Sequence, residues 1–191
     1  MVKKSVLILL VLSCALLCGC DNSKRIDKAI IVECIAVGSS DYKFIYISQE
    51  EKSESVTIKA ESLENALSVL KTEHKSEVVI SNLGLLAFAK NTPSSKIYEA
   101  VNRIKNDYSV SPSVYTAICS DEIIDNLENP KLIDNCYEQI MLLEKKETDV
   151  SSTLLKLHNN LNKYAKGLIY LPNISSNDGI KGEKIEIMIK K

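Results

Sequence analysis

The sequence predicts a single α+β domain in which amphipathic helices pack on a central mixed β-sheet. Two observations support this prediction. Short runs rich in apolar and β-branched residues alternate with stretches whose apolar residues recur at i, i+3, i+4 and i+7, the spacing of one helix face. The expected order begins with three strands, a helix, two strands, a helix and a strand, and it ends with mainly helical sequence and two late strands. Early hairpins mixed with crossover helices indicate one mixed sheet with helices packed against it.

The first part of the chain is expected to form antiparallel strands. Residues 29–37 are almost continuously apolar, as in a buried strand, and Gly38–Asp41 has the composition of a turn. Residues 42–48 are rich in aromatic and β-branched side chains and predict the partner strand of a hairpin. A charged loop then leads to a third strand at 55–60.

A helix is expected next, with Ser62 or Glu61 near its start. Its buried stripe should consist of Leu63, Ala66, Leu67 and Leu70. Two strands follow at 77–81 and 83–89, and Asn82 between them is a candidate β-bulge.

The second long helix has the clearest pattern in the chain. Thr92 is expected to cap it, and Pro93 suits the first helical position. Its buried stripe should consist of Ile97, Ala100, Val101 and Ile104. After Pro112, residues 114–119 predict a strand, and Ser120 is expected to cap a short helix at 121–127.

The C-terminal third is expected to be mainly helical before it ends in two strands. Asn129-Pro130 should end the short helix, and residues 131–144 are predicted to be helical in part. Thr148 or Asp149 is expected to cap a third long helix, with Gly167 as the residue after its end. The face of this helix should carry Leu154, Leu157, Leu161 and Tyr164, and strands are predicted at 168–171 and 184–189.

The N-terminus has the layout of an export signal that ends in a lipidation site. Lys3 and Lys4 precede an apolar stretch of about a dozen residues, which is shorter than the roughly 20 that a spanning helix needs. Leu17–Cys20 then reads as a lipobox, and polar sequence begins immediately after Cys20. Cysteine is required there because its thiolate accepts the diacylglycerol.

Cys14 and Cys18 fit a lipidation site less well than Cys20 does. Cleavage before Cys14 would leave a very short apolar region, and Leu17 before Cys18 is too large for the residue at the cut. A signal anchor left uncut is the alternative to cleavage, and it would also place the rest of the chain outside the cytoplasm. The expected organisation is therefore a signal peptide at 1–19, the lipidated Cys20 with a polar tether at 20–28, and one α/β domain at 29–191.

Composition excludes several kinds of function. The chain has 24 basic and 25 acidic residues, and loss of Lys3 and Lys4 with the signal would change its formal charge from −1 to −3. Nucleic-acid binding usually requires a concentrated basic surface, so no nucleic-acid partner is expected. Cys34, Cys119 and Cys136 are odd in number and widely spaced, which favours small buried side chains over a zinc site or disulfide framework. One pair could still oxidise outside the cell.

The sequence offers no arrangement of residues that predicts catalysis. His74 is expected in a polar loop and His158 on the third long helix, and no metal-binding, nucleophile or phosphate-binding motif is present. The acidic pairs Glu50-Glu51 and Asp121-Glu122 suit a solvated loop and a helix start. No catalytic residue, metal site or cofactor is therefore predicted, and Cys20 is the only candidate functional residue.

Taken together, the order of segments resembles a known family. The matching segments are the lipobox followed by Ile26–Val32, the helix with Glu64–Leu67, the strand ending Leu85–Ala89, the helix leading to Asp107-Tyr108, and Ser120–Ile124 after a strand. Over roughly residues 15 to 175 this pattern resembles the N-terminal domain of the Ger(x)C family, the lipoprotein C subunits of spore germinant receptors. Typical members are longer and carry further α/β domains.

The resemblance implies a non-enzymatic lipoprotein that is anchored on the extracytoplasmic face of the spore inner membrane. Its partners would be integral A- and B-type receptor subunits, and it would act in nutrient-triggered germination. The alternative is a stand-alone solute- or envelope-binding lipoprotein, which should carry a sizeable apolar pocket. An extracytoplasmic enzyme would need clustered titratable groups in a cleft.

Overall fold

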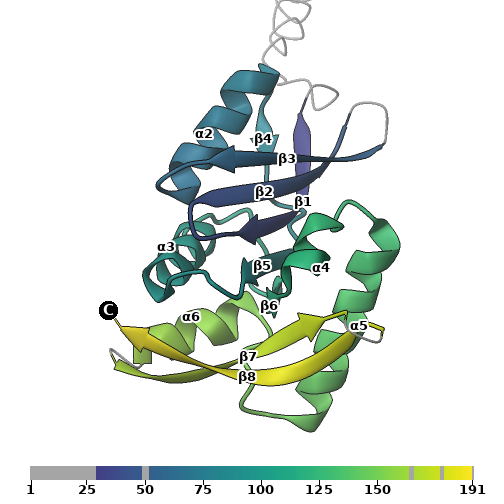
Figure 1. Cartoon of the computed structure of the whole chain (residues 1–191). Coiled ribbons are helices and arrows are strands. Elements are labelled where there is room, and N and C mark those ends of the chain that lie inside the picture. The colour runs from purple at the N-terminus through teal and green to yellow at the C-terminus, as the bar shows by residue number, and fades with distance from the viewer. Residues whose placement is uncertain (1–28, 49–51, 164–165, 177–178, 191) are drawn as a thin grey trace, which may run out of the picture.

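The computed structural model describes residues 29–48, 52–163, 166–176 and 179–190, and it confirms a single α+β domain built on a mixed eight-stranded sheet. The elements are β1 (Ile30–Val37), β2 (Asp41–Ile47), β3 (Ser53–Lys59), α2 (Leu63–His74), β4 (Val78–Val79), β5 (Leu85–Ala89), α3 (Ser94–Lys105), β6 (Tyr115–Cys119), α4 (Asp121–Asp125), α5 (Pro130–Lys146), α6 (Leu154–Lys163), β7 (Lys166–Ser175) and β8 (Lys181–Lys190). The strand order is β3-β2-β1-β5-β6-β7-β8, and β4 pairs with the start of β1 (Figure 1).

The sheet is parallel in its middle and antiparallel at both edges. β1, β5, β6 and β7 are parallel neighbours, whereas β2 and β3 on one side and β8 on the other run antiparallel to the strands beside them. The predicted hairpin between the first two strands is confirmed. In its turn, Gly38 leaves room for the side chain of Asp41, because an added Cβ would lie 1.9 Å from the Asp41 carboxylate and would displace it.

Helices cover both faces of the sheet and create two hydrophobic cores. α2, α3 and α6 enclose the larger core, and the predicted stripes of α2 and α3 are buried in it. α4 and α5 cover the opposite face, where the smaller core contains Cys34, Cys119 and Cys136. Each fully buried leucine or isoleucine contributes about 1.5 to 3 kcal/mol, so these faces supply most of the driving force for folding.

Of the caps predicted for the first two long helices, one is confirmed and one is wrong. Ser62 does cap α2, since its hydroxyl accepts the N–H of Asn65 at 3.2 Å. Thr92 does not cap α3: its hydroxyl donates to the carbonyl of Val37 at 2.7 Å, and Pro93 rather than Thr92 takes the cap position. The hydroxyl of Thr92 therefore binds the last residue of β1 instead of the helix N-terminus.

The third long helix also begins and ends differently from the prediction. α6 begins at Leu154 and is capped by Thr153, not by Thr148 or Asp149. Gly167 does not follow the helix end but lies inside β7, paired with Ile189 of β8. Tyr164 lies outside the described residues.

The remaining differences concern the length of elements. Residues 131–144 are helical throughout, because α5 runs unbroken from Pro130 to Lys146 and Asn129 caps it. The strand expected at 77–81 shrinks to β4, and Asn82 lies in a turn rather than a bulge. A register shift occurs instead in β1, between Val32 and Cys34. Ser120 starts α4 but makes no side-chain capping bond.

Candidate functional site

The residue that the sequence singles out, Cys20, lies outside the described residues, as do the whole signal segment 1–19 and the tether 20–28. The described chain begins beside β4. The N–H of Ile30 donates to the carbonyl of Glu77 at 2.8 Å, and Ile30 pairs with Val78. The chain therefore joins the sheet next to β4 and the C-terminal end of α2 (Figure 1).

A surface depression of about 260 Å³ lies at this end of the molecule, and we refer to it as the α2–α3 depression. Its apolar lining comes from Leu67, Val78 and Ile80. Its charged lining consists of Glu64, Lys71, Glu77, Arg103 and Asp107.

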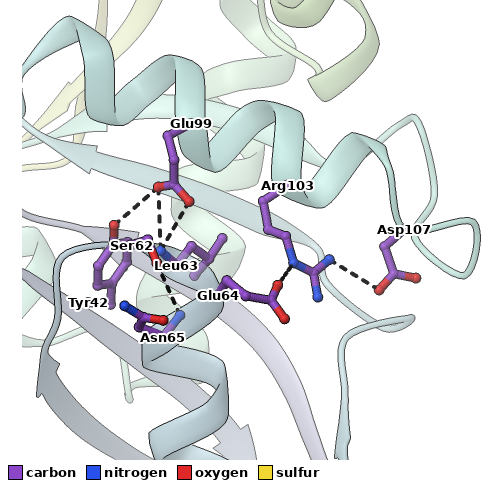
Figure 2. A network of polar contacts seen from close by, with 8 residues as sticks. All are labelled: Tyr42, Ser62, Leu63, Glu64, Asn65, Glu99, Arg103 and Asp107. Atoms are coloured by element: carbon purple, nitrogen blue, oxygen red, sulfur yellow. Dashed lines mark hydrogen bonds and ion pairs between the residues drawn. The ribbon is translucent and has the colours of Figure 1, made fainter.

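The charged groups of the α2–α3 depression are paired with one another. Arg103 of α3 donates to the carboxylate of Glu64 on α2, and it lies 3.6 Å from Asp107 one turn further along (Figure 2). Hydrogen bonds from Ser109, together with the nearby Arg103, lower the pKa of Asp107. Each exposed ion pair of this kind contributes about 0 to 1 kcal/mol, so the network orders the surface more than it stabilises the fold.

Glu99 connects α3 to the start of α2 and to the sheet. Its carboxylate accepts the Tyr42 hydroxyl at 3.2 Å and the backbone N–H of Leu63 at 3.2 and 3.4 Å (Figure 2). Negative charge at a helix N-terminus is favourable, and here one carboxylate satisfies groups from two elements. Burial, and then Glu99, raise the pKa of Tyr42, so the phenol stays neutral. Because Glu99 already serves these two donors, its role is structural.

A second depression, of about 280 Å³, lies where β1 and β5 end. Open α/β sheets commonly bind ligands at such a position. Its lysine is already engaged: Lys43 donates to the carbonyls of Ile124 (3.0 Å) and Asp125 (2.7 Å) and to Glu128 (3.0 Å). Lys43 therefore holds the end of α4, and the carboxylates of Asp41 and Asp121 line the depression without a histidine or cysteine beside them.

The largest of these three depressions, about 400 Å³, lies between α6 and β7. Polar and apolar side chains share its lining, including Asp149, Asn159, Asn160, Leu168 and Tyr170. Asp149 is bound by Lys184 at 2.9 Å, and the ammonium of Lys184 also lies 4.3 Å from the centre of the Tyr170 ring. Asp149 and Lys156, the charged residues that line this depression, are thus both paired with opposite charges of the same chain.

The histidines do not form a site. The sequence predicts that His74 lies in a loop, and this prediction is wrong, because His74 is the last residue of α2. Its ring packs edge-to-face with that of Tyr46 at a centroid distance of 5.3 Å. His158 lies on α6 as expected and contacts Asn162 one turn away. In the described ranges, no cluster of His, Cys, Asp and Glu is arranged to hold a metal ion.

The cysteines behave as small apolar residues. Cys34, Cys119 and Cys136 are free and buried in the smaller core. Burial raises the pKa of all three thiols, that of Cys136 to about 11. A thiol must ionise to act as a nucleophile, so these side chains are inert near neutral pH.

Of the two acidic pairs, Asp121-Glu122 lies at a helix start, as its sequence predicts. Asp121 and Glu122 occupy the first turn of α4, and Glu122 also accepts the hydroxyl of Ser176. Glu50 and Glu51 lie outside the described residues. The sequence did not reveal the contacts of Glu99 with Tyr42 or of Arg103 with Glu64, because these partners are more than thirty positions away.

None of the helices in the described part of the chain combines the length and apolar character needed to cross a bilayer. Comparison of the chain with protein-family models, curated proteins and solved structures finds no match.

Proposed function

We propose that this protein is a membrane-anchored lipoprotein subunit of a spore germinant receptor. It acts without catalysis, on the extracytoplasmic face of the spore inner membrane, through contacts with integral A- and B-type subunits. The observation that carries the proposal is the lipobox Leu17–Cys20 at the end of a signal-like segment, followed by segments in the order typical of the Ger(x)C N-terminal domain.

The position at which the chain joins the sheet supports a role for the α2–α3 depression. A chain spans at most about 3.3 to 3.6 Å per residue, so the segment from Cys20 to Ala29 reaches roughly 30 Å. A lipid on Cys20 would therefore hold the end with α2 and β4 close to the bilayer. Two acyl chains give stable anchoring, because each buried methylene contributes about 0.8 kcal/mol. The charged rim of the depression would then face membrane partners.

The depressions favour protein contacts over the alternative, a stand-alone solute-binding lipoprotein. Solute pockets are mainly apolar and have a few convergent polar groups. The largest depression described above, about 400 Å³, has a mixed lining, and Asp149 in it is already neutralised by Lys184. The carboxylates of the α2–α3 depression are likewise paired, which also argues against acid–base catalysis there.

The proposal is tested by purifying the full-length lipoprotein from detergent-solubilised spore inner membranes and measuring the A- and B-type subunits that accompany it. Both subunits should be present in amounts comparable to the lipoprotein, and a strain that lacks this protein should respond less to nutrients. Purification without either subunit, from spores that germinate normally without the protein, would support the solute-binding alternative.

A matched pair of charge reversals locates the contact. Lys71 pairs with Glu77 in the lining of the α2–α3 depression. Lys156 of α6 pairs with Glu144 of α5, and Figure 1 shows both of these helices at the end of the molecule away from α2. Lys71→Glu should reduce the recovered subunits several-fold, because it reverses a charge on the proposed contact surface. Lys156→Glu, which breaks an equivalent exposed pair, should leave the recovery unchanged. The reverse result would place the contact elsewhere.

A further inference from the structure

β8 is the last strand of the sheet, and β7 is its only strand neighbour among the described residues. The two strands pair over their full length, from Lys166 opposite Lys190 to Ser175 opposite Lys181. The other side of β8 is a sheet edge. Its capacity to pair with another strand depends on which backbone groups point outward.

The register identifies these groups. Tyr170 of β7 accepts the N–H of Ser151 at 2.7 Å, so its carbonyl points away from β8. In an antiparallel pair, residues alternate between those that exchange hydrogen bonds and those that do not. Glu186, opposite Tyr170, therefore directs its own N–H and C=O to the free edge. The same holds for Lys184 and Met188, two positions away on either side.

Two further contacts agree with this assignment. Gly182 belongs to the same alternation, and its N–H donates to the side chain of Gln139 at 3.2 Å rather than to β7. Pro172 has no N–H to give, and it lies opposite Lys184, where no ladder bond is required. Gln139 thus closes the edge at Gly182, and the free stretch lies beyond it.

The free stretch lacks two of the features that usually keep edge strands apart, although it does carry lysines. Proline, bulges and charged side chains, lysine above all, discourage edge pairing in many proteins. β8 has neither a proline nor a register shift against β7. Ile185 and Ile187 pack on the larger core, while Met188 and its cross-strand neighbour Leu168 are 61% and 45% exposed.

We propose that the edge of β8 binds the same strand of a second copy of this chain, antiparallel, about a two-fold axis at Ile185. This register places Lys184 of each copy, whose ammonium also lies 2.9 Å from Asp149 of its own chain, opposite Glu186 of the other, and both residues direct their backbone groups outward. Opposite charges across a strand pair are favourable and like charges are not. A shift of two residues in either direction would oppose Lys184 to Lys184, or Glu186 to Glu186. Charge therefore selects a self-complementary register, which a closed dimer needs.

The test is the oligomeric state of the full-length protein purified in detergent, measured by sedimentation equilibrium over a range of concentrations. The wild type should form dimers. Glu186→Pro removes an outward N–H without removing a bond to β7, so it should weaken dimerisation at least about tenfold while leaving the fold intact. Glu186→Lys keeps the N–H but opposes two lysines, and it should also weaken the dimer.

Thr57→Pro is the matched control on the opposite edge of the sheet. The bond from the N–H of Ser48 to the carbonyl of Lys52 fixes the alternation of the β2–β3 pair, and Thr57 therefore points its N–H outward from β3. This variant should dimerise like the wild type. A wild type that is monomeric at all concentrations would overturn the proposal. Unchanged dimerisation of both Glu186 variants, or loss of dimerisation in Thr57→Pro alone, would also overturn it. None of these outcomes depends on the receptor role, because no partner subunit is present.

Discussion

At the residue scale, the carboxylate of Glu99 joins α3 to β2 and to the start of α2. It accepts one hydrogen bond from the hydroxyl of Tyr42 on β2 and shares the single N–H of Leu63, at the start of α2, between its two oxygens. Glu99→Ala should lower the free energy of unfolding by about 2 to 3 kcal/mol, because hydrogen bonds to a charged group and a helix cap are lost together. Tyr42→Phe, which removes a single bond, should cost about 1 kcal/mol. Urea denaturation monitored by circular dichroism measures both, and equal costs would contradict this account of Glu99.

The buried thiols predict how stability depends on alkaline pH. Burial raises the pKa of Cys136 from 9.0 to about 11. The unfolded chain therefore loses its proton first, so the stability that this thiol contributes is complete below pH 9 and is lost as pH rises to 11. The free energy of unfolding should fall across this window, and less steeply in Cys136→Ala. A wild type with constant stability from pH 9 to 11, measured in urea, would be the opposite outcome.

At the scale of elements, the cap of α6 is Thr153 in the structure, whereas the sequence predicts Thr148 or Asp149. The side chain of Thr153 accepts the N–H of Lys156 at 3.4 Å, whereas Thr148 is exposed in the preceding turn. Thr153→Ala should cost about 1 kcal/mol and Thr148→Ala close to nothing. Thermal unfolding of the two variants side by side is the measurement. A larger loss in Thr148→Ala would favour the longer helix that the sequence predicts.

Helix faces were predictable and helix ends were less so, for a physical reason. Burial of an apolar stripe follows from spacing alone, and the stripes of α2 and α3 are buried as expected. A cap depends on which acceptor or donor a short polar side chain meets. Thr92 meets the carbonyl of Val37, which is 55 positions away in the sequence. Glycine is the residue type that most often follows a helix end, which is why the sequence predicts Gly167 there. The ten-residue pairing of β7 with β8 places it in a strand instead.

At the scale of the whole molecule, the order of the segments predicts a mixed sheet packed by helices, and the structure confirms it. The position of β8 at an edge and the pairing of β4 with β1 depend on long-range packing, and local sequence does not encode them. The same holds for the α2–α3 depression, whose charged groups come from α2, α3 and the segments that follow these two helices. Sequence can predict a lipidation site at Cys20 because a lipobox is local, and it missed Glu99 and Arg103 because their roles exist only after folding.

The central claim is that a lipid on Cys20 holds this domain at a membrane. Fractionation of cells that express the full-length wild type or Cys20→Ala tests it most directly, with labelling by a fatty-acid analogue. The wild type should be labelled and should sediment with membranes. The variant should be unlabelled and released into the soluble fraction, with an unchanged unfolding temperature, because Cys20 lies before the folded domain. A variant that still sediments with membranes would contradict the claim.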